Sequence, residues 1–132
     1  MSGIVSLASL VLAEFWSERH LCTLTTLRKD GSPHVVAVGA TLADGVCRVI
    51  SSSTSAHVRH IRNGQSRVAV CQVDRARWTT VEGLAVVKDD PASVRHAEEL
   101  YAKRYRTPRP NPLRVVIEIG VTKVLGSSPF TA

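Results

Sequence analysis

The amino-acid sequence predicts a mainly β protein in which six antiparallel strands close into a small barrel with flanking helices. Two turn pairs, Asp30-Gly31 and Asp44-Gly45, each lie between apolar, β-branched segments and are typical of β-hairpins. Hairpin connections dominate the expected order of elements, which favours an antiparallel barrel over a parallel sheet with crossover helices. At 132 residues the chain is expected to form one domain, residues 1–132.

The expected strands are short apolar runs separated by polar or turn-forming residues. Each run is enriched in Val, Ile, Thr and Leu, which suit a pleated, half-buried surface. The strands are expected at 21–27, 33–39, 46–50, 67–73, 78–87 and 114–125.

Three helices are expected outside the strands. Residues 5–18 show apolar side chains at helical spacing. A short basic helix follows the third strand and stops at Asn63-Gly64. Asp90 followed by Pro91 predicts a capped helix start. The segment 107–112 contains three prolines, so it should form neither a helix nor a central strand.

The charge balance predicts an anionic partner. The chain has 17 Lys and Arg against 11 Asp and Glu, a net charge of +6, and 13 of the basic residues are Arg. The planar guanidinium of Arg suits carboxylates and phosphates. These arginines are spread along the chain, and few aromatic residues are available to stack on bases, so a phosphorylated small molecule is favoured over nucleic acid.

Cysteine usage and the N-terminal segment predict a cytoplasmic protein. Cys22, Cys47 and Cys71 are widely separated in apolar contexts, which is typical of buried thiols in a reducing compartment. Residues 1–14 lack a basic n-region and a cleavage site and are too short to span a bilayer, so neither a signal peptide nor a membrane segment is expected.

A run of hydroxyl residues at 51–55 is the strongest indication of a binding site. It leads from a strand into the short helix that carries His57, Arg59, His60 and Arg62. Unpaired N–H groups at a helix start attract anions, and hydroxyls can donate to phosphate oxygens. Capping preferences explain the same hydroxyls without a ligand, so an ordinary Ser/Thr-capped surface helix is the alternative.

The sequence offers little acid–base machinery of its own. It contains no dinucleotide glycine fingerprint, no Walker loop and no nucleophile elbow. His57 and His60 have no nearby carboxylate or Cys to complete a metal shell, so no metal is expected. These shortages favour an enzyme whose cofactor supplies the reactivity. His34 and Trp78 could line such a site or serve in packing, and Arg106 and Arg109 lie on a proline-stiffened loop suited to an extended polyanion.

Several segments resemble the pyridoxamine 5′-phosphate oxidase-like split β-barrel family, notably 32–38, 67–70 and 81–85. Within it, the chain is similar to the actinobacterial coenzyme F420-dependent reductases, the branch that includes the F420-dependent biliverdin reductases. The segments that carry this closer resemblance are 17–21, 24–28, 72–74, 76–78 and above all 104–112, so the resemblance spans residues 17–126.

The resemblance implies a six-stranded, FMN-binding-like split barrel and a homodimer with a cofactor groove at each end of the subunit interface. It implies hydride transfer from reduced F420 to a conjugated small-molecule substrate such as a biliverdin-like tetrapyrrole. Trp78 is a further candidate for the site wall. The implied cofactor-binding residues are Pro33, His34, Val35, Val36, Ala37 and Val38 at the ring, Ser51, Ser52, Ser53, His57, Val58 and Arg59 at the phosphate, and Arg106, Pro108 and Arg109 on a closing loop.

One position departs from the family pattern. Relatives commonly place a Lys where this chain has His57. Because His is mostly neutral at pH 7, Arg59 is expected to provide the charge toward phosphate. No catalytic acid is evident, so solvent is expected to supply the proton.

Two other functions fit the same residues. An FMN enzyme or FMN-binding protein would use the same phosphate cradle, although the +6 charge and the Arg-rich loop favour F420 with its polyglutamate tail. A non-catalytic module that stores or senses a cofactor or tetrapyrrole would bind its ligand without turnover.

Overall fold

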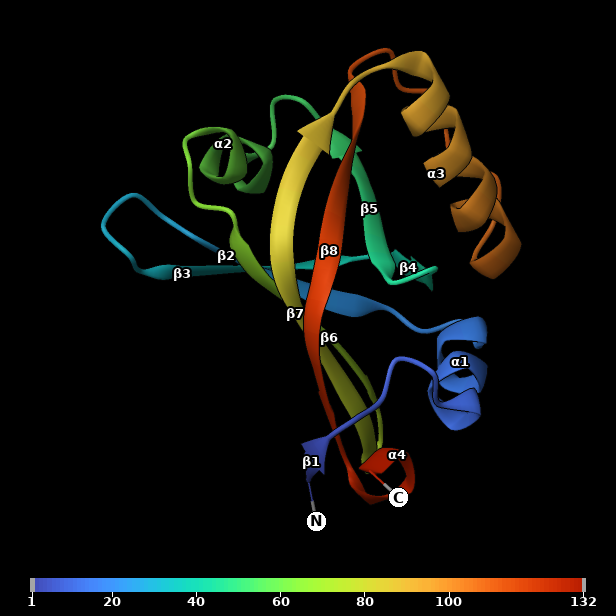
Figure 1. The fold of residues 1–132 in the computed structure, drawn as a ribbon. Coiled ribbons are helices and arrows are strands. Elements are labelled where there is room, and N and C mark those ends of the chain that lie inside the picture. Colours follow the sequence, from blue (N-terminus) through green and yellow to red (C-terminus); the bar gives the residue numbers. More distant parts are fainter. Residues whose placement is uncertain (1, 132) are drawn as a thin grey trace.

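The protein is built on one antiparallel sheet (Figure 1). The computed structural model describes residues 2–131, so residues 1 and 132 of the expected domain lie outside the described residues. The strands are β1 (Gly3–Ile4), β2 (Cys22–Leu27), β3 (Pro33–Val38), β4 (Ala40–Ala43), β5 (Val46–Ser52), β6 (Arg67–Asp74), β7 (Arg77–Lys88) and β8 (Arg114–Gly126). Their order is β3-β2-β6-β7-β8-β5-β4, and β1 pairs with β8. The mainly β, antiparallel architecture is therefore as predicted.

The sheet curls so that its two ends meet at Gly39. β3 and β4 occupy opposite ends of the strand order, yet only Gly39 separates them in the sequence. A Cβ atom at this position would lie 2.7 Å from the ring of Tyr101, so the junction has no space for a side chain. The lack of a side chain at Gly39 thus lets an aromatic ring pack directly on its backbone at the junction that closes the barrel.

The number of strands differs from the prediction: eight strands form within residues 2–131, not six. The additional strands are β1 and β4. Residues 40–43 lie between Gly39 and the Asp44-Gly45 turn, and this short interval gives no periodic pattern. Both Asp44 and Gly45 adopt positive φ angles, 53° and 74°, as the predicted tight hairpin turn requires.

Four helices flank the sheet in the described residues, and one of them, α4, was not predicted. The helix expected over 5–18 begins only at Leu10, because Ser9 caps it and the N–H of Val5 instead donates to the Val124 carbonyl, 2.8 Å away. The predicted Asp90 cap is confirmed, since its carboxylate accepts from the Ser93 N–H at 3.0 Å. The helices are α1 (Leu10–Ser17), α2 (Ala56–Arg62), α3 (Pro91–Arg104) and α4 (Ser128–Thr131).

The interior of the barrel is mostly apolar, with buried polar side chains such as Thr26 and Gln72, and α2 covers one end of it. Leu24, Val70 and Ile117 are completely buried inside the sheet. Val58 and Ile61 of α2 join this core, and α2 packs on β2 and β7. α3 packs along β4, β5 and β8, where Figure 1 shows it beside β5. The residues that connect β5 to α2 and α3 to β8 are therefore brought to the same side of the barrel.

A buried arginine, Arg104, fixes the end of α3. Its Nε donates to the Glu18 carbonyl at 2.8 Å, and Nη1 donates to the Ala40 carbonyl at 2.6 Å. Nη2 donates to Gln72, and the guanidinium lies over the ring of Trp16. Charge-assisted hydrogen bonds of this kind are stronger than neutral ones. Arg104 therefore holds the start of the following loop at a fixed place on the barrel.

Candidate functional site

A cavity of about 550 Å³ opens where β3, β5, α2, α3 and the loop after α3 come together. We call it the anion cavity. Its elements are far apart in sequence, and the closure of the sheet and the packing of α3 bring them to one place. The lining residues are Ala37, Val38, Gly39, Ile50, Ser51, Ser52, His57, Tyr101, Arg106, Pro108, Arg109, Asn111 and Arg114.

The anion cavity is strongly basic. Three of its lining residues are arginines, and among the described lining residues none is Asp or Glu. The guanidiniums of Arg106 and Arg109 are exposed, and the described residues give them no ion-pair or hydrogen-bond partner. Arg114 is held in place by Glu98 and by the Arg109 carbonyl. The two unpaired guanidiniums, those of Arg106 and Arg109, are donors suited to phosphate.

Two serine hydroxyls complete the polar wall of the cavity. Ser51 Oγ lies 2.7 Å from His57 Nε2 and 3.2 Å from Ser55 Oγ. Ser55 is the N-cap residue of α2, but its side chain makes no capping hydrogen bond. The hydroxyls are therefore bonded to one another and to His57 instead of capping the helix, which disfavours the simple capping explanation.

His57 contributes hydrogen-bonding capacity without charge at neutral pH. Burial, with smaller contributions from His34 and His60, lowers the pKa of His57 below its ordinary value of 6.5. The imidazole is then neutral at pH 7, and the positive charge of the anion cavity comes from its arginines.

His34, His57 and His60 form a cluster beside the cavity. The His34 ring centroid lies 5.2 Å from that of His60 and 6.4 Å from that of His57. His60 Nδ1 is 2.9 Å from Thr26 Oγ1, whereas the buried Nδ1 of His34 has no hydrogen-bond partner. Desolvation also lowers the pKa of His60, together with the charges of His34, Arg28 and Arg59. Within this cluster of packed imidazoles, His57 and His60 therefore resist protonation.

The residues predicted for the site divide into two groups. Eight lie in the anion cavity: Ala37, Val38, Ser51, Ser52, His57, Arg106, Pro108 and Arg109. The other eight do not line it: Pro33, His34, Val35, Val36, Ser53, Val58, Arg59 and Trp78.

The second group is displaced for identifiable reasons. Val58 is completely buried in the core, and Val36 packs against that core. The backbone N–H of Ser53 donates to the Leu113 carbonyl at 2.9 Å. Trp78 lies near the start of β7, where its N–H donates to Ser127 just after the end of β8. Within one chain, Trp78 is therefore not a wall of the anion cavity.

Arg59 does not have the surroundings expected of a phosphate ligand. Its side chain is exposed, and its Nη1 donates to the Thr54 carbonyl at 2.6 Å. Successive helical residues are about 100° apart, so Arg59 projects from a different side of α2 than His57. The charge expected from Arg59 is supplied at the cavity by Arg106, Arg109 and Arg114 instead.

Sequence reasoning missed Gly39, Ile50, Tyr101, Asn111 and Arg114. Arg114 is the most informative of these, because it is the Cα partner of Ser52 in the β5–β8 ladder. That register brings the first residue of β8 beside the hydroxyl run. The pairing of two strands more than 60 positions apart carries no local signal, so only the tertiary structure identifies Arg114.

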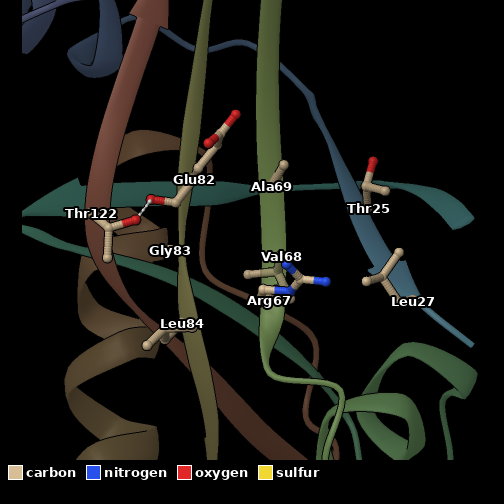
Figure 2. Close-up of a pocket in the computed structure, with 9 residues that line it drawn as sticks. All are labelled: Thr25, Leu27, Arg67, Val68, Ala69, Glu82, Gly83, Leu84 and Thr122. Atoms are coloured by element: carbon tan, nitrogen blue, oxygen red, sulfur yellow. Dashed lines mark hydrogen bonds between the residues drawn. The ribbon is translucent and has the colours of Figure 1, made fainter. Parts of the chain in front are cut away.

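A second hollow, of about 310 Å³, lies on the outer face of the sheet over β2, β6, β7 and β8 (Figure 2). Figure 2 shows Leu27 and Leu84 at its sides and the Thr122 hydroxyl donating to the Glu82 carbonyl at 3.2 Å. Gly83 lies at a β-bulge in its floor, where a Cβ would be 2.2 Å from the Gly120 carbonyl oxygen. This face also exposes Val35 and Val86.

One acidic cluster has ligating atoms close enough for a metal ion. Glu18, His20 and Asp74 offer atoms within 4.8 Å of one another. Arg77 already pairs with Glu18, at 2.9 Å, and with Asp74. The guanidinium lowers the pKa of Glu18 to about 2 and bonds to both carboxylates, so the cluster is explained as an ion-pair network.

Fold and site together define a curled antiparallel barrel protein with an arginine-lined cavity that has no Asp or Glu among its described lining residues. Residues 11–127 match the family model of pyridoxamine 5′-phosphate oxidase, and the chain belongs to this family. No helix within residues 2–131 has the length and apolar character needed to cross a membrane.

The chain is also similar to individual proteins, one in sequence and two in structure. It is 54% identical over 117 residues to the F420H(2)-dependent biliverdin reductase of Mycobacterium tuberculosis. This alignment covers 86% of this chain and 84% of that protein. The conserved hypothetical protein Rv2991 of the same organism has a TM-score of 0.77 at 20% identity, covering 92% of this chain and 85% of that one. A solved F420 reductase has a TM-score of 0.70 at 24% identity, covering 84% and 93%. These structures confirm the predicted split-barrel fold.

Proposed function

We propose that this protein is an oxidoreductase that transfers a hydride from reduced coenzyme F420 to a conjugated substrate of the biliverdin type. The observation that carries the proposal is the anion cavity, with three guanidiniums and two serine hydroxyls and no carboxylate among its described lining residues. The 54% identity to an F420H(2)-dependent biliverdin reductase supports both the coenzyme and the substrate class.

The residues of the anion cavity fit a phosphorylated deazaflavin. Arg106, Arg109 and Arg114 would hold the phosphate with Ser51 and Ser52. Ala37 and Val38, at the end of β3, provide an adjacent apolar edge for the ring. When bound, the coenzyme supplies the hydride, and the chain binds, orients and excludes water. Since His57 is neutral and bonded to Ser51, solvent remains the expected proton source.

A pair of titrations tests the coenzyme choice. FMN is the alternative, because it also carries a phosphate. Purified apo-protein should bind F420 and quench or shift its fluorescence, with much weaker binding of FMN. Tight FMN binding without F420 binding would overturn the proposal.

A turnover assay separates an enzyme from a non-catalytic binding module. Reduced F420 should be oxidised in the presence of biliverdin and remain reduced without it. Coenzyme binding combined with no turnover on biliverdin and a panel of conjugated compounds would favour a storage or sensing function.

We also propose that the protein is a homodimer that uses the outer face shown in Figure 2. This face exposes Leu84 and Val86 on β7 and Val35 on β3, and exposed apolar side chains gathered on one face are typical of interfaces. Leu84→Glu should shift the mass measured by light scattering from dimer to monomer. Leu10→Glu, which adds the same charge at a more exposed leucine on α1, should leave the dimer intact.

A cytoplasmic location is the final part of the proposal. Cys22, Cys47 and Cys71 are free thiols, and burial raises the pKa of Cys22 and Cys47. Buried, protonated thiols of this kind are typical of proteins in reducing compartments.

A further inference from the structure

A third cavity adjoins the anion cavity and shares two lining residues with it. It has a volume of about 450 Å³ and is lined by Arg19, Leu21, Tyr101, Tyr105 and Arg106. We call it the aromatic compartment. Tyr101 and Arg106 line both cavities. A ligand bound in the anion cavity can therefore extend a group into the aromatic compartment.

The aromatic wall of this compartment is rigid. The Tyr105 hydroxyl donates to the His20 carbonyl at 2.6 Å and accepts from the Ala40 N–H at 3.1 Å. The ring centroids of Tyr105 and Tyr101 are 4.9 Å apart, and the Tyr101 ring packs on the backbone of Gly39. The described residues give the Tyr101 hydroxyl no hydrogen-bond partner. Tyr101, which lines both cavities, therefore keeps a free hydroxyl at their boundary.

The charges in the compartment are unpaired. The side chains of Arg19 and Arg106 are exposed, and neither forms an ion pair or hydrogen bond with a described residue. Glu18, next to Arg19 in sequence, is already engaged by Arg77 and His20. Two free guanidiniums beside tyrosine rings and a leucine form a site for a carboxylate carried on an apolar or flexible chain.

We propose that the aromatic compartment is a carboxylate subsite in which Arg19 and Arg106 bind the acid group and the two tyrosines contact the chain that carries it. The inference rests on the proposed function, because it requires the coenzyme in the neighbouring anion cavity or the substrate bound next to it. The carboxylate could come from either of two ligands: the acidic tail of the coenzyme or a side-chain carboxylate of the substrate.

Arg19→Gln is the discriminating variant, since Arg19 lines the aromatic compartment but not the anion cavity. Lys29→Gln is the matched control: it removes the same charge at an exposed position in the turn between β2 and β3. Four ligands are compared: F420 with its glutamate tail, a deazaflavin phosphate without the tail, biliverdin and biliverdin dimethyl ester.

Arg19→Gln should weaken the binding of one carboxylate-bearing ligand, either tailed F420 or biliverdin, by roughly tenfold. This is the effect expected from losing one charge-assisted hydrogen bond. A higher Kd for tailed F420 alone identifies the coenzyme tail as the occupant. A higher KM for biliverdin but not for its dimethyl ester identifies the substrate carboxylate. Equal effects on all four ligands, or no difference from Lys29→Gln, overturn the subsite.

Failure of the subsite can be distinguished from failure of the proposed function. Wild-type protein that neither binds F420 nor reduces biliverdin contradicts the function itself. Wild-type protein that does both, while Arg19→Gln behaves as Lys29→Gln, contradicts only the carboxylate subsite. Arg19 has no described contact to lose, so the variant should fold normally, which its thermal unfolding can verify.

Discussion

Arg114 Nη1 donates to Glu98 Oε2 at 2.8 Å, which joins the first residue of β8 to α3. The other terminal nitrogen of Arg114 donates to the Arg109 carbonyl at 2.7 Å. One side chain thus connects the helix, the proline-rich loop and the anion cavity. Glu98 does not itself line that cavity, yet its carboxylate holds the Arg114 guanidinium in place.

Replacing Glu98 by Gln should weaken binding of the phosphorylated coenzyme by about 1 kcal/mol, because Arg114 loses an oriented partner. Simple electrostatics predicts the opposite, since the change makes the protein more positive. Glu99→Gln, an exposed neighbour that has no bond to Arg114, is the control for net charge. Binding that tightens equally in both variants would contradict a positioning role for Glu98. Fluorescence titration of the coenzyme measures both.

Replacing Arg109 by Ala should weaken coenzyme binding by about 1.5–3 kcal/mol if its guanidinium meets phosphate. Arg59→Ala removes the same charge from a residue outside the anion cavity and should leave the affinity nearly unchanged. The same titration compares the two. A large loss of affinity in Arg59→Ala with none in Arg109→Ala would instead place the phosphate at α2, as the sequence alone suggested.

The histidine cluster should make the protein less stable as the pH falls below about 6.5. The pKa values of His57 and His60 are lowered in the folded protein, so the unfolded chain binds protons first. Stability is complete above the ordinary value of 6.5 and declines below it. Carboxylates such as Glu18, whose pKa is lowered from 4.5, affect stability only at more acidic pH.

Urea unfolding at several pH values between 4.5 and 7.5 tests this dependence. His57→Gln should flatten the decline, whereas His96→Gln, at an exposed position on α3, should not change it. An identical pH profile for wild type and His57→Gln would show that the cluster does not control acid stability.

Gly83→Ala should destabilise the fold by about 1–3 kcal/mol, because the added Cβ would lie 2.2 Å from the Gly120 carbonyl oxygen. Gly120→Ala is a matched control on the facing strand, where the nearest atom to a new Cβ is 3.9 Å away. Chemical denaturation of both variants measures the difference. Equal stability would mean that the β-bulge at Glu82 and Gly83 relaxes without cost.

Local sequence signals were sufficient for much of the barrel. The Asp-Gly turns, the Asp90 cap and the six longer strands depend on neighbouring residues, and all occur in the structure. β4 was missed because four residues between two turn signals show no period. The early part of the helix expected at 5–18 was wrong because Val5 joins the sheet beside Val124, a long-range contact that outweighs local helical spacing.

The candidate site was only half predictable for the same reason. Ser51 and Ser52 were found because the hydroxyl run is contiguous, and Arg106 and Arg109 because the loop is rich in Arg and Pro. Arg114 and Tyr101 reach the cavity through strand register and helix packing, which are tertiary properties. Trp78 does not line the anion cavity of one chain, because its distance from the hydroxyl run depends on the path of β7 across the whole barrel, and its expected place in the cofactor site stays a prediction.

The segment 105–113 is secured at both ends, by buried Arg104 on one side and by the Glu98-bound Arg114 on the other. Its interior residues can therefore be exchanged without loosening the barrel. Substitutions confined to this segment could therefore change the ligand preference during evolution, while the barrel keeps its stability. Libraries randomised at 106–111 would be an economical starting point for redirecting this protein to new anionic compounds.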